Sequence, residues 1–213
     1  MREEISIARS CAVNRSEKSG PHSAQVAARE RVLEMADQLF ATHGYQAVSL
    51  RDIGASLGMR HASLYYHFPN GKEELYVAVV ERRMRGYQTQ LEQVLRDAGS
   101  DWRQQLRAAA RWMVAQPHMH LGRMMQSDMP AISEESADTL RVIVRDALLQ
   151  PLTRPIQQAL ADNPEKRQRS VTYAGMFLSL IEGIENLPAN YLTSSKNELV
   201  DVVIDFVLHG LTS

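Results

Sequence analysis

The chain has 213 residues, of which 44% are hydrophobic and 23% charged, and its formal net charge is −1. This length allows one or two domains with a sizeable core, and the near-neutral charge excludes a protein covered in basic surface. One cysteine, Cys11, excludes an internal disulfide framework and fits a reducing cytoplasm. No stretch approaches the about 20 apolar residues of a membrane span, and no secretory signal opens the sequence.

The first 22 residues are mixed polar, and we expect them to form a disordered tail. Their four basic residues could follow a DNA backbone, although an idle tail is the simpler interpretation. A helix is expected over residues 24–43, because apolar residues recur there at helical spacing. Its apolar face consists of Val32, Leu33, Ala36, Leu39 and Phe40.

A short second helix is expected after Ser49. Ser49 and Asp52 have the spacing of a capping box, in which each side chain bonds to the backbone N–H of the other. Leu50, Ile53 and Leu57 follow as an apolar stripe. Gly58 stands where the helix should end in a left-handed residue, a conformation that glycine adopts at no steric cost.

A third helix of about seven residues is expected from Arg60 to His67. Leu64 and Phe68 are four apart and predicted to point inward, which leaves polar and aromatic groups outside. A helix this short is not stable alone and must be held by its neighbours. Two short helices about a tight turn are typical of a helix-turn-helix, whose second helix lies in the major groove of DNA.

Residues 24–75 resemble the tetracycline-repressor (TetR) family of bacterial transcription regulators. The resemblance lies in Leu-Tyr-Tyr-His-Phe at 64–68 and Lys-Glu-Glu-Leu at 72–75, after Ser-Leu-Arg-Asp-Ile-Gly at 49–54. It implies base-proximal positions at Arg51, His61, Ala62 and Tyr65, and phosphate-binding positions at Ser49, Ser63, Tyr66, His67 and Lys72. Arg60, at the start of the predicted third helix, is a further candidate for contacting a base. Binding a phosphate is an equal alternative for it.

Two departures from the family pattern stand out. Ala62 replaces a common Gly or Pro and could contact a thymine methyl group. The segment from Phe68 to Lys72 is one residue longer than the common form, which leaves the reach of Lys72 open. Other interpretations also remain for single residues: Tyr65 as a packed core aromatic, His67 as a cap, and Arg51 with Asp52 as a surface ion pair.

The rest of the chain is predicted to be helical, so the fold class is all-α. A long helix over 72–97 follows the helix-turn-helix, and Asp101 and Ser133 begin later helices. We expect Pro151 and Pro155 to break or kink a helical stretch over 134–162. The expected organisation is a tail at 1–22, a DNA-binding domain at 23–71, and an effector-binding and dimerisation domain at 72–213.

The last two predicted helices, 165–187 and 196–211, are apolar over more than half their circumference. Such helices belong either to the core or to an interface between subunits, and the family resemblance implies a four-helix dimer interface. A two-fold dimer predicts a palindromic operator. The interface candidates are Val171, Ala174, Leu178, Ile181, Ile184, Leu199, Val203 and Phe206.

The region between, about 100–163, would hold the effector by the same resemblance. Five methionines cluster there, and methionine adapts to irregular apolar ligands. The pocket candidates are Trp112, Met113, Met119, Met124, Met125, Met129, Tyr173 and Phe177, with ordinary core filling as the alternative. His118 and His120 lie two residues apart and so face different sides of a helix, which argues against a metal site.

No motif of a catalytic elbow, a nucleotide loop or a zinc protease is present, and we expect neither an enzyme nor a cofactor. The sequence predicts a cytoplasmic, nucleoid-associated regulator that binds double-stranded operator DNA as a homodimer. A repressor released by a small apolar or amphipathic effector is favoured. The alternatives are a regulator without small-molecule control and a helical dimeric interaction module.

Overall fold

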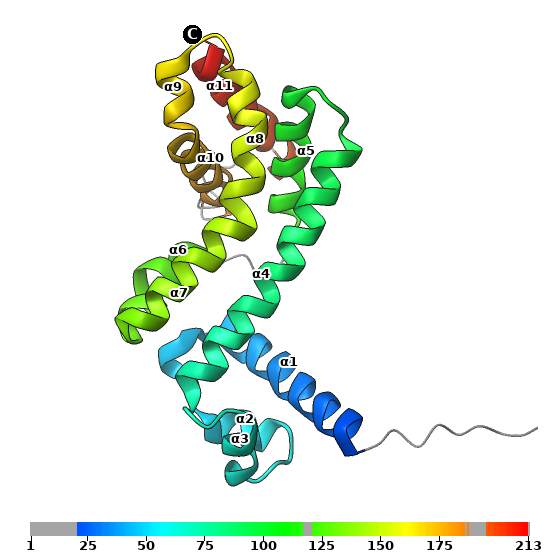
Figure 1. The fold of residues 1–213 in the computed structure, drawn as a ribbon, viewed down its shortest axis with the longest axis vertical. Helices are drawn as coiled ribbons and strands as arrows, with labels where there is room; N and C mark the ends of the chain where they lie inside the picture. Colours follow the sequence, from blue (N-terminus) through cyan, green and yellow to red (C-terminus); the bar gives the residue numbers. More distant parts are fainter. Residues whose placement is uncertain (1–20, 117–120, 186, 188–194, 213) are drawn as a thin grey trace, which may run out of the picture.

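The computed structural model describes residues 21–116, 121–185, 187 and 195–212, and these form helices with no strand among them (Figure 1). The all-α prediction is confirmed. Two bundles lie at opposite ends of one long helix: a small bundle of the first three helices, and a larger one of the helices that follow it. Cys11 and most of the predicted tail, residues 1–20, lie outside the described part of the chain.

Three helices make up the small bundle: α1 (Pro21–Ala47), α2 (Leu50–Ser56) and α3 (His61–His67). Helix α1 begins two residues inside the predicted tail, and proline is favoured at a first helical position. Its backbone leaves the helical conformation at Gly44, close to the predicted end at residue 43. All of the predicted apolar face except the half-buried Leu39 is buried in the core.

Helix α4 (Lys72–Asp97) has the predicted bounds and runs from the small bundle into the large one. About three turns into α4, ion pairs join the helix to α1. The Arg82 guanidinium lies 3.0 Å from Glu30 and 3.2 Å from Glu34, and the Arg83 guanidinium pairs with Asp37. These ion pairs hold α1 of the small bundle against the long helix α4.

The large bundle continues through α5 (Trp102–Val114), a short α6 (Leu121–Arg123), the π-helical turn η1 (Met124–Asp128) and the 3-10 turn η2 (Met129–Ala131). Next come α7 (Glu134–Val144), the π-helical turn η3 (Arg145–Leu149), α8 (Gln150–Ala159), α9 (Pro164–Gln168), α10 (Ser170–Glu185) and α11 (Lys196–Thr212). Asp101 and Ser133 cap α5 and α7, as predicted: each side chain accepts a backbone N–H of the following turn.

A break or a kink was predicted at Pro151 and Pro155, and of these two alternatives the break does not occur. The chain stays helical from α7 through η3 into α8, with Pro151 in the first turn of α8 and Pro155 inside it. A proline clashes with the carbonyl one turn earlier only in a regular α-helix. The wider π-helical turn at 145–149, just before Pro151, loosens this constraint, and Pro155 is buried against the core.

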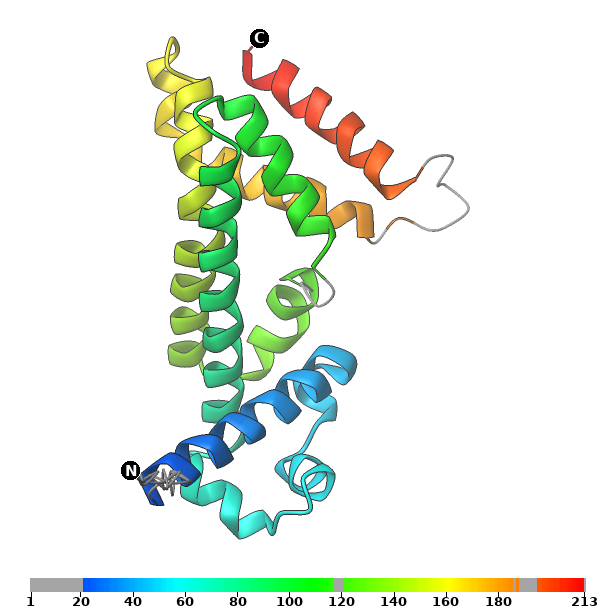
Figure 2. The ribbon, with the colours of Figure 1, turned by 90° about the vertical axis from the view of Figure 1, so that its right-hand side faces the viewer.

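Helices α10 and α11 lie together at the far end of the large bundle from the small one (Figure 2). On α11, Val200, Ile204 and Leu208 are buried. The neighbouring face of α11 is held to α5 by ion pairs, from Arg107 to Asp205 at 2.6 Å and from Arg111 to Asp201 at 3.0 Å.

Candidate DNA-binding site

Helix α2 begins with the predicted capping box. The Ser49 hydroxyl accepts from the Asp52 N–H at 3.2 Å, and the Asp52 carboxylate accepts from the Ser49 N–H at 2.9 Å. The Ser49 hydroxyl also donates to that carboxylate, and these bonds hold the pKa of Asp52 below its usual value. No ion pair joins Asp52 to Arg51 among the described residues, although the nearby Arg51 charge also helps to lower the pKa of Asp52.

Gly58 makes the turn between α2 and α3 with a φ of +63°, the left-handed conformation predicted for it. The Met59 N–H then donates to the Gly54 carbonyl at 2.9 Å, which draws the turn back onto α2. Leu64 and Phe68 are fully buried, as predicted, and anchor the inward face of α3. The helix is therefore held by tertiary packing, as its length requires.

The outward face of α3 carries most of the predicted DNA-binding residues. Tyr65 is 45% exposed and Tyr66 70% exposed, so Tyr65 is not a buried core residue. Arg60 and Ala62 are exposed, while Ser63 and His67 are half-buried. The backbone of His61 begins α3, but its side chain lies outside the described part of the structure. Two of the predicted residues come from α2 and its cap: Arg51 and Ser49 are both exposed.

Lys72 begins α4 and is half-buried beside the small bundle. Its ammonium donates to the Gln46 carbonyl at 3.4 Å and lies 4.1 Å from the centre of the Tyr45 ring. Partial burial lowers the pKa of Lys72, against the opposing effect of Asp128 and Asp52. The ammonium has three donors, so the bond to Gln46 leaves others for a phosphate.

One further cation near α3 was missed by the sequence reasoning. The exposed Arg29 guanidinium of α1 lies 4.9 Å from the centre of the Phe68 ring, at the end of the recognition helix. Arginine over an aromatic ring is a favourable contact. No local sequence pattern could have found it, because the two residues are 39 positions apart and meet only through packing.

The effector-pocket candidates that the structure describes lie in different surroundings. Met113, Met124, Met129 and Phe177 are buried in the core, and Met125 is 49% exposed. The half-buried Trp112 packs edge-on against Tyr87, and Tyr173 packs against the core from α10. Met119, with His118 and His120, lies outside the described residues.

A small cavity lies between α1, α4 and α6–η1. Of the pocket candidates only Met124 lines it, together with apolar side chains of α1 and α4 and three charged residues, Arg83, Arg123 and Asp128. The cavity has about 20 Å³ of free space, which is room for about one water molecule. Among the described residues, no hydrogen-bond partner faces the buried Nε of Arg123.

Several dimer-interface candidates need correction. Ala174, Leu178, Ile181 and Ile184 are buried inside their own protomer, because this face of α10 packs onto the large bundle. Leu199 and Val203 are half-buried against the core, while Val171 and Phe206 are exposed at 43% and 72%. The exposed apolar side chains of the two helices also include three that the sequence reasoning missed: Met176, Leu180 and Val202.

Among the described residues, no group of three or more His, Cys, Asp or Glu side chains is placed to hold a metal ion. Within these ranges no helix combines the length and apolar character needed to cross a membrane.

Comparison with known proteins supports the interpretation of the small bundle. Residues 32–79 match the family model described as bacterial regulatory proteins, tetR family. The HTH-type transcriptional regulator YxaF of Bacillus subtilis is 46% identical over 52 residues, which are 24% of this chain and 27% of that protein. The negative transcriptional regulator IcaR of the biofilm operon icaADBC of Staphylococcus epidermidis is 42% identical over 53 residues, 25% of this chain and 28% of that protein. The chain thus covers only about a quarter of the length of these relatives.

The whole fold has solved counterparts. The structure of AibR in complex with isovaleryl coenzyme A and operator DNA aligns with a TM-score of 0.66 and 19% identity, covering 84% of this chain and 96% of that one. This likeness extends the shared fold beyond the helix-turn-helix. Residues 32–79 thus match the tetR family of bacterial regulatory proteins, and beyond them the likeness to solved structures is one of fold.

Proposed function

We propose that this protein is a DNA-binding transcriptional regulator, which binds a palindromic operator as a homodimer and is released by a small-molecule effector. The observation that carries the proposal is the outward face of α3. Two fully buried side chains, Leu64 and Phe68, fix this helix, and its opposite face offers tyrosines and hydrogen-bonding groups to the solvent. That is the arrangement by which a recognition helix reaches base edges in the major groove.

The distribution of charge supports the same proposal. Many arginines of the larger bundle are engaged in ion pairs, as Arg107 and Arg141 are. Within the described ranges neither Arg51 nor Arg60 makes an ion pair, and both are exposed beside α3. A cation without a carboxylate partner is free to pair with phosphate or guanine. We assign Arg51, Arg60, His61, Ala62 and Tyr65 to base edges, and the phosphate contacts to Ser49, Ser63, Tyr66, His67 and Lys72.

The homodimer is proposed from the exposed apolar side chains of α10 and α11. Val202 and Phe206 are 64% and 72% exposed one turn apart on α11, and Met176 on α10 is 56% exposed. A cluster of exposed apolar side chains on two neighbouring helices is typical of an interface. Two-fold pairing there would place two recognition helices on half-sites about 34–36 Å apart.

The remaining part of the proposal is that an effector releases the protein from DNA. Residues 23–71 would form the DNA-binding domain, and residues 72–213 the effector-binding and dimerisation domain. The cavity beside Met124 is lined by apolar side chains together with Arg83, Arg123 and Asp128, which suits an amphipathic molecule. It must widen to admit one, so binding would select another arrangement of α4 and α6. We propose repression as the outcome; the relative IcaR is described as a negative regulator.

A fluorescence-anisotropy titration tests this proposal. The probe is double-stranded DNA from upstream of the protein's own coding region, the competitor is a scrambled duplex, and the titration is repeated at several salt concentrations. If the protein is a regulator of this kind, its binding to the upstream DNA should persist in the presence of the scrambled competitor. Tyr65→Ala should weaken that binding by about 1–3 kcal/mol and leave the scrambled duplex less affected. Tyr65→Phe is the matched control, which separates the hydroxyl from the ring.

Three outcomes are informative. Equal losses on both duplexes would move Tyr65 from base edges to the backbone contacts. Binding that no small molecule releases would favour a regulator without effector control. Absence of binding even at low salt, where non-specific binding should be strong, would refute the DNA-binding function and leave a helical dimeric interaction module.

A further inference from the structure

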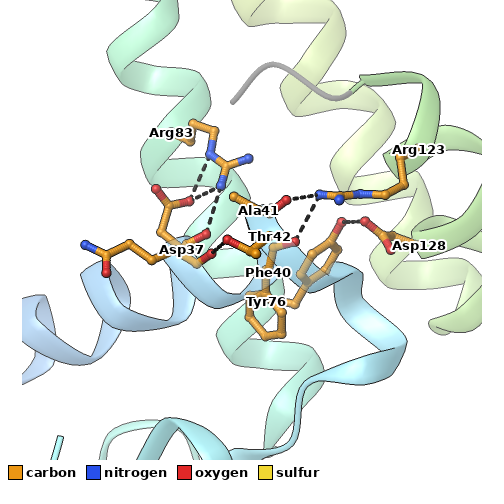
Figure 3. Close-up of polar contacts among 9 residues, drawn as sticks. Asp37, Phe40, Ala41, Thr42, Tyr76, Arg83, Arg123 and Asp128 are labelled. Carbon is orange, nitrogen blue, oxygen red and sulfur yellow. Dashed lines mark hydrogen bonds and ion pairs between the residues drawn. The ribbon is translucent and has the colours of Figure 1, made fainter. Parts of the chain in front are cut away.

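Asp128, the last residue of η1, is a buried carboxylate that reaches from the large bundle to the small one. It is 5% exposed. Its Oδ1 accepts from the Tyr45 backbone N–H at 3.0 Å. Its Oδ2 accepts from the Tyr76 hydroxyl at 3.1 Å (Figure 3). A buried charge is costly unless hydrogen bonds satisfy it, so these two bonds restrain all three groups.

Arg123, at the end of α6, makes a second link beside the first. Its Nη2 donates to the Phe40 carbonyl at 3.0 Å and to the Ala41 carbonyl at 2.7 Å (Figure 3). These oxygens belong to the end of the regular part of α1, just before Gly44, where carbonyls lack an intrahelical partner. A cation at this end is also favoured by the helix dipole. The end of α1 is therefore capped by a residue more than 80 positions later in the chain.

The hydrogen bonds of Asp128 and Arg123 hold a short segment of chain that leads directly to the helix-turn-helix. Only three residues separate Tyr45 from Ser49, the N-cap of α2, and α2 carries α3 through the turn at Gly58. The other end of the linking segment is also held. The Gly122 N–H donates to the Glu182 carboxylate of α10 at 2.7 Å. Residues 121–128 thus connect α10, at the other end of the molecule, with the entry to the helix-turn-helix.

We propose that Asp128 is a positioning residue for DNA recognition. Its carboxylate, held by Tyr76 and flanked by Arg123, fixes the main chain at Tyr45 and so sets the angle of the helix-turn-helix to α4. The proposal rests on the DNA-binding function for its consequence. The restraint itself is a property of the free protein and is measurable without DNA.

The test compares Asp128→Ala with Asp138→Ala in the full chain. Asp138 is exposed on α7 and pairs with Arg141 of the same helix, so both variants remove one negative charge but only one removes the link. Hydrogen exchange should show the Tyr45 amide exchanging about ten-fold faster or more in Asp128→Ala, because the amide no longer bonds to a charged acceptor. Faster exchange should extend over residues 45–57 and leave α10 unchanged.

The same variants are then titrated with operator and scrambled duplex. Asp128→Ala should lower operator affinity about ten-fold relative to Asp138→Ala, with equal affinities for the scrambled duplex, because the loss is one of position and not of charge. Asp128→Asn keeps an acceptor for the Tyr45 N–H and should restore most of the operator affinity. A purely structural role would lower the unfolding midpoint and both affinities together. Tyr76→Phe, which removes one bond and keeps the ring, should give an intermediate effect.

Two results would overturn the proposal, and they are distinguishable. Unchanged exchange over residues 45–57 in Asp128→Ala, in a protein that binds its operator, would refute the role of Asp128 alone. Faster exchange in a protein that binds no DNA would refute the DNA-binding function, and with it any role of Asp128 in recognition.

Discussion

Gly44 is the residue at which α1 leaves the helical conformation, and its replacement by alanine should destabilise the protein measurably. Its φ of +80° and ψ of 168° lie in a region that is essentially restricted to glycine. Holding alanine there costs about 1–3 kcal/mol. Alanine also reduces the freedom of the unfolded chain, which returns about 0.4–1 kcal/mol. The expected net loss in the free energy of unfolding for Gly44→Ala is therefore about 1–2 kcal/mol.

Steric crowding adds little to this value. A Cβ at Gly44 would lie 3.4 Å from the Asp128 Oδ1 and 4.0 Å from the Arg123 Nε, which are ordinary contact distances. The cost should thus come from the backbone. Gly58→Ala is the matched control, because its φ of +63° lies in the ordinary left-handed region and no atom lies within 4 Å of the added Cβ. Its expected loss is below about 1 kcal/mol.

The assay is urea unfolding followed by far-ultraviolet circular dichroism, with the loss calculated from the midpoint at a common slope. Gly44→Ala should shift the midpoint further than Gly58→Ala does. A Gly44→Ala protein as stable as the wild type, or one no less stable than Gly58→Ala, would refute the argument that the backbone at Gly44 is reserved for glycine.

Two further predictions concern DNA binding and the dimer. Lys72→Ala should weaken binding to every DNA sequence and lower the slope of log affinity against log salt concentration by about 0.9 for each phosphate that the protein no longer neutralises. Anisotropy at several salt concentrations measures this slope, with Lys166→Ala on the distant α9 as control. An unchanged slope would show that Lys72 does not bind phosphate. Phe206→Glu should convert a dimer to monomers in sedimentation velocity, because it places a charge in the proposed apolar interface. Val142→Glu, at an apolar side chain 45% exposed on α7, should not. A Phe206→Glu protein that stays dimeric would place the interface elsewhere.

Local features of the small bundle could be predicted from sequence because they depend on neighbours a few residues away. The Ser49–Asp52 capping box, the left-handed turn at Gly58 and the inward Leu64 and Phe68 are all found as predicted. Each follows from spacing within one or two helical turns. The bounds of α4 are also found as predicted.

The prediction failed where a local pattern admits more than one packing. Helices α10 and α11 are apolar on more than one face, so periodicity could not separate the face that packs on the bundle from the one left exposed. Ala174 and Ile181 were therefore assigned to an interface although they are buried, and Met176 was missed. The π-helical turn before Pro151 leaves no sequence signal, so a break or kink was expected there although the chain stays helical.

The sequence by itself determined the helix-turn-helix and the all-α class, since these rest on spacings and caps within single helices, and its motifs showed the resemblance of the small bundle to the tetR family. Only the tertiary structure decided how that bundle is fastened to the rest. The bonds from Asp128 to Tyr45 and from Arg123 to Phe40 join residues 83 positions apart. Each requires a particular approach of η1 or α6 to the end of α1, and that approach is set by the packing of the whole core.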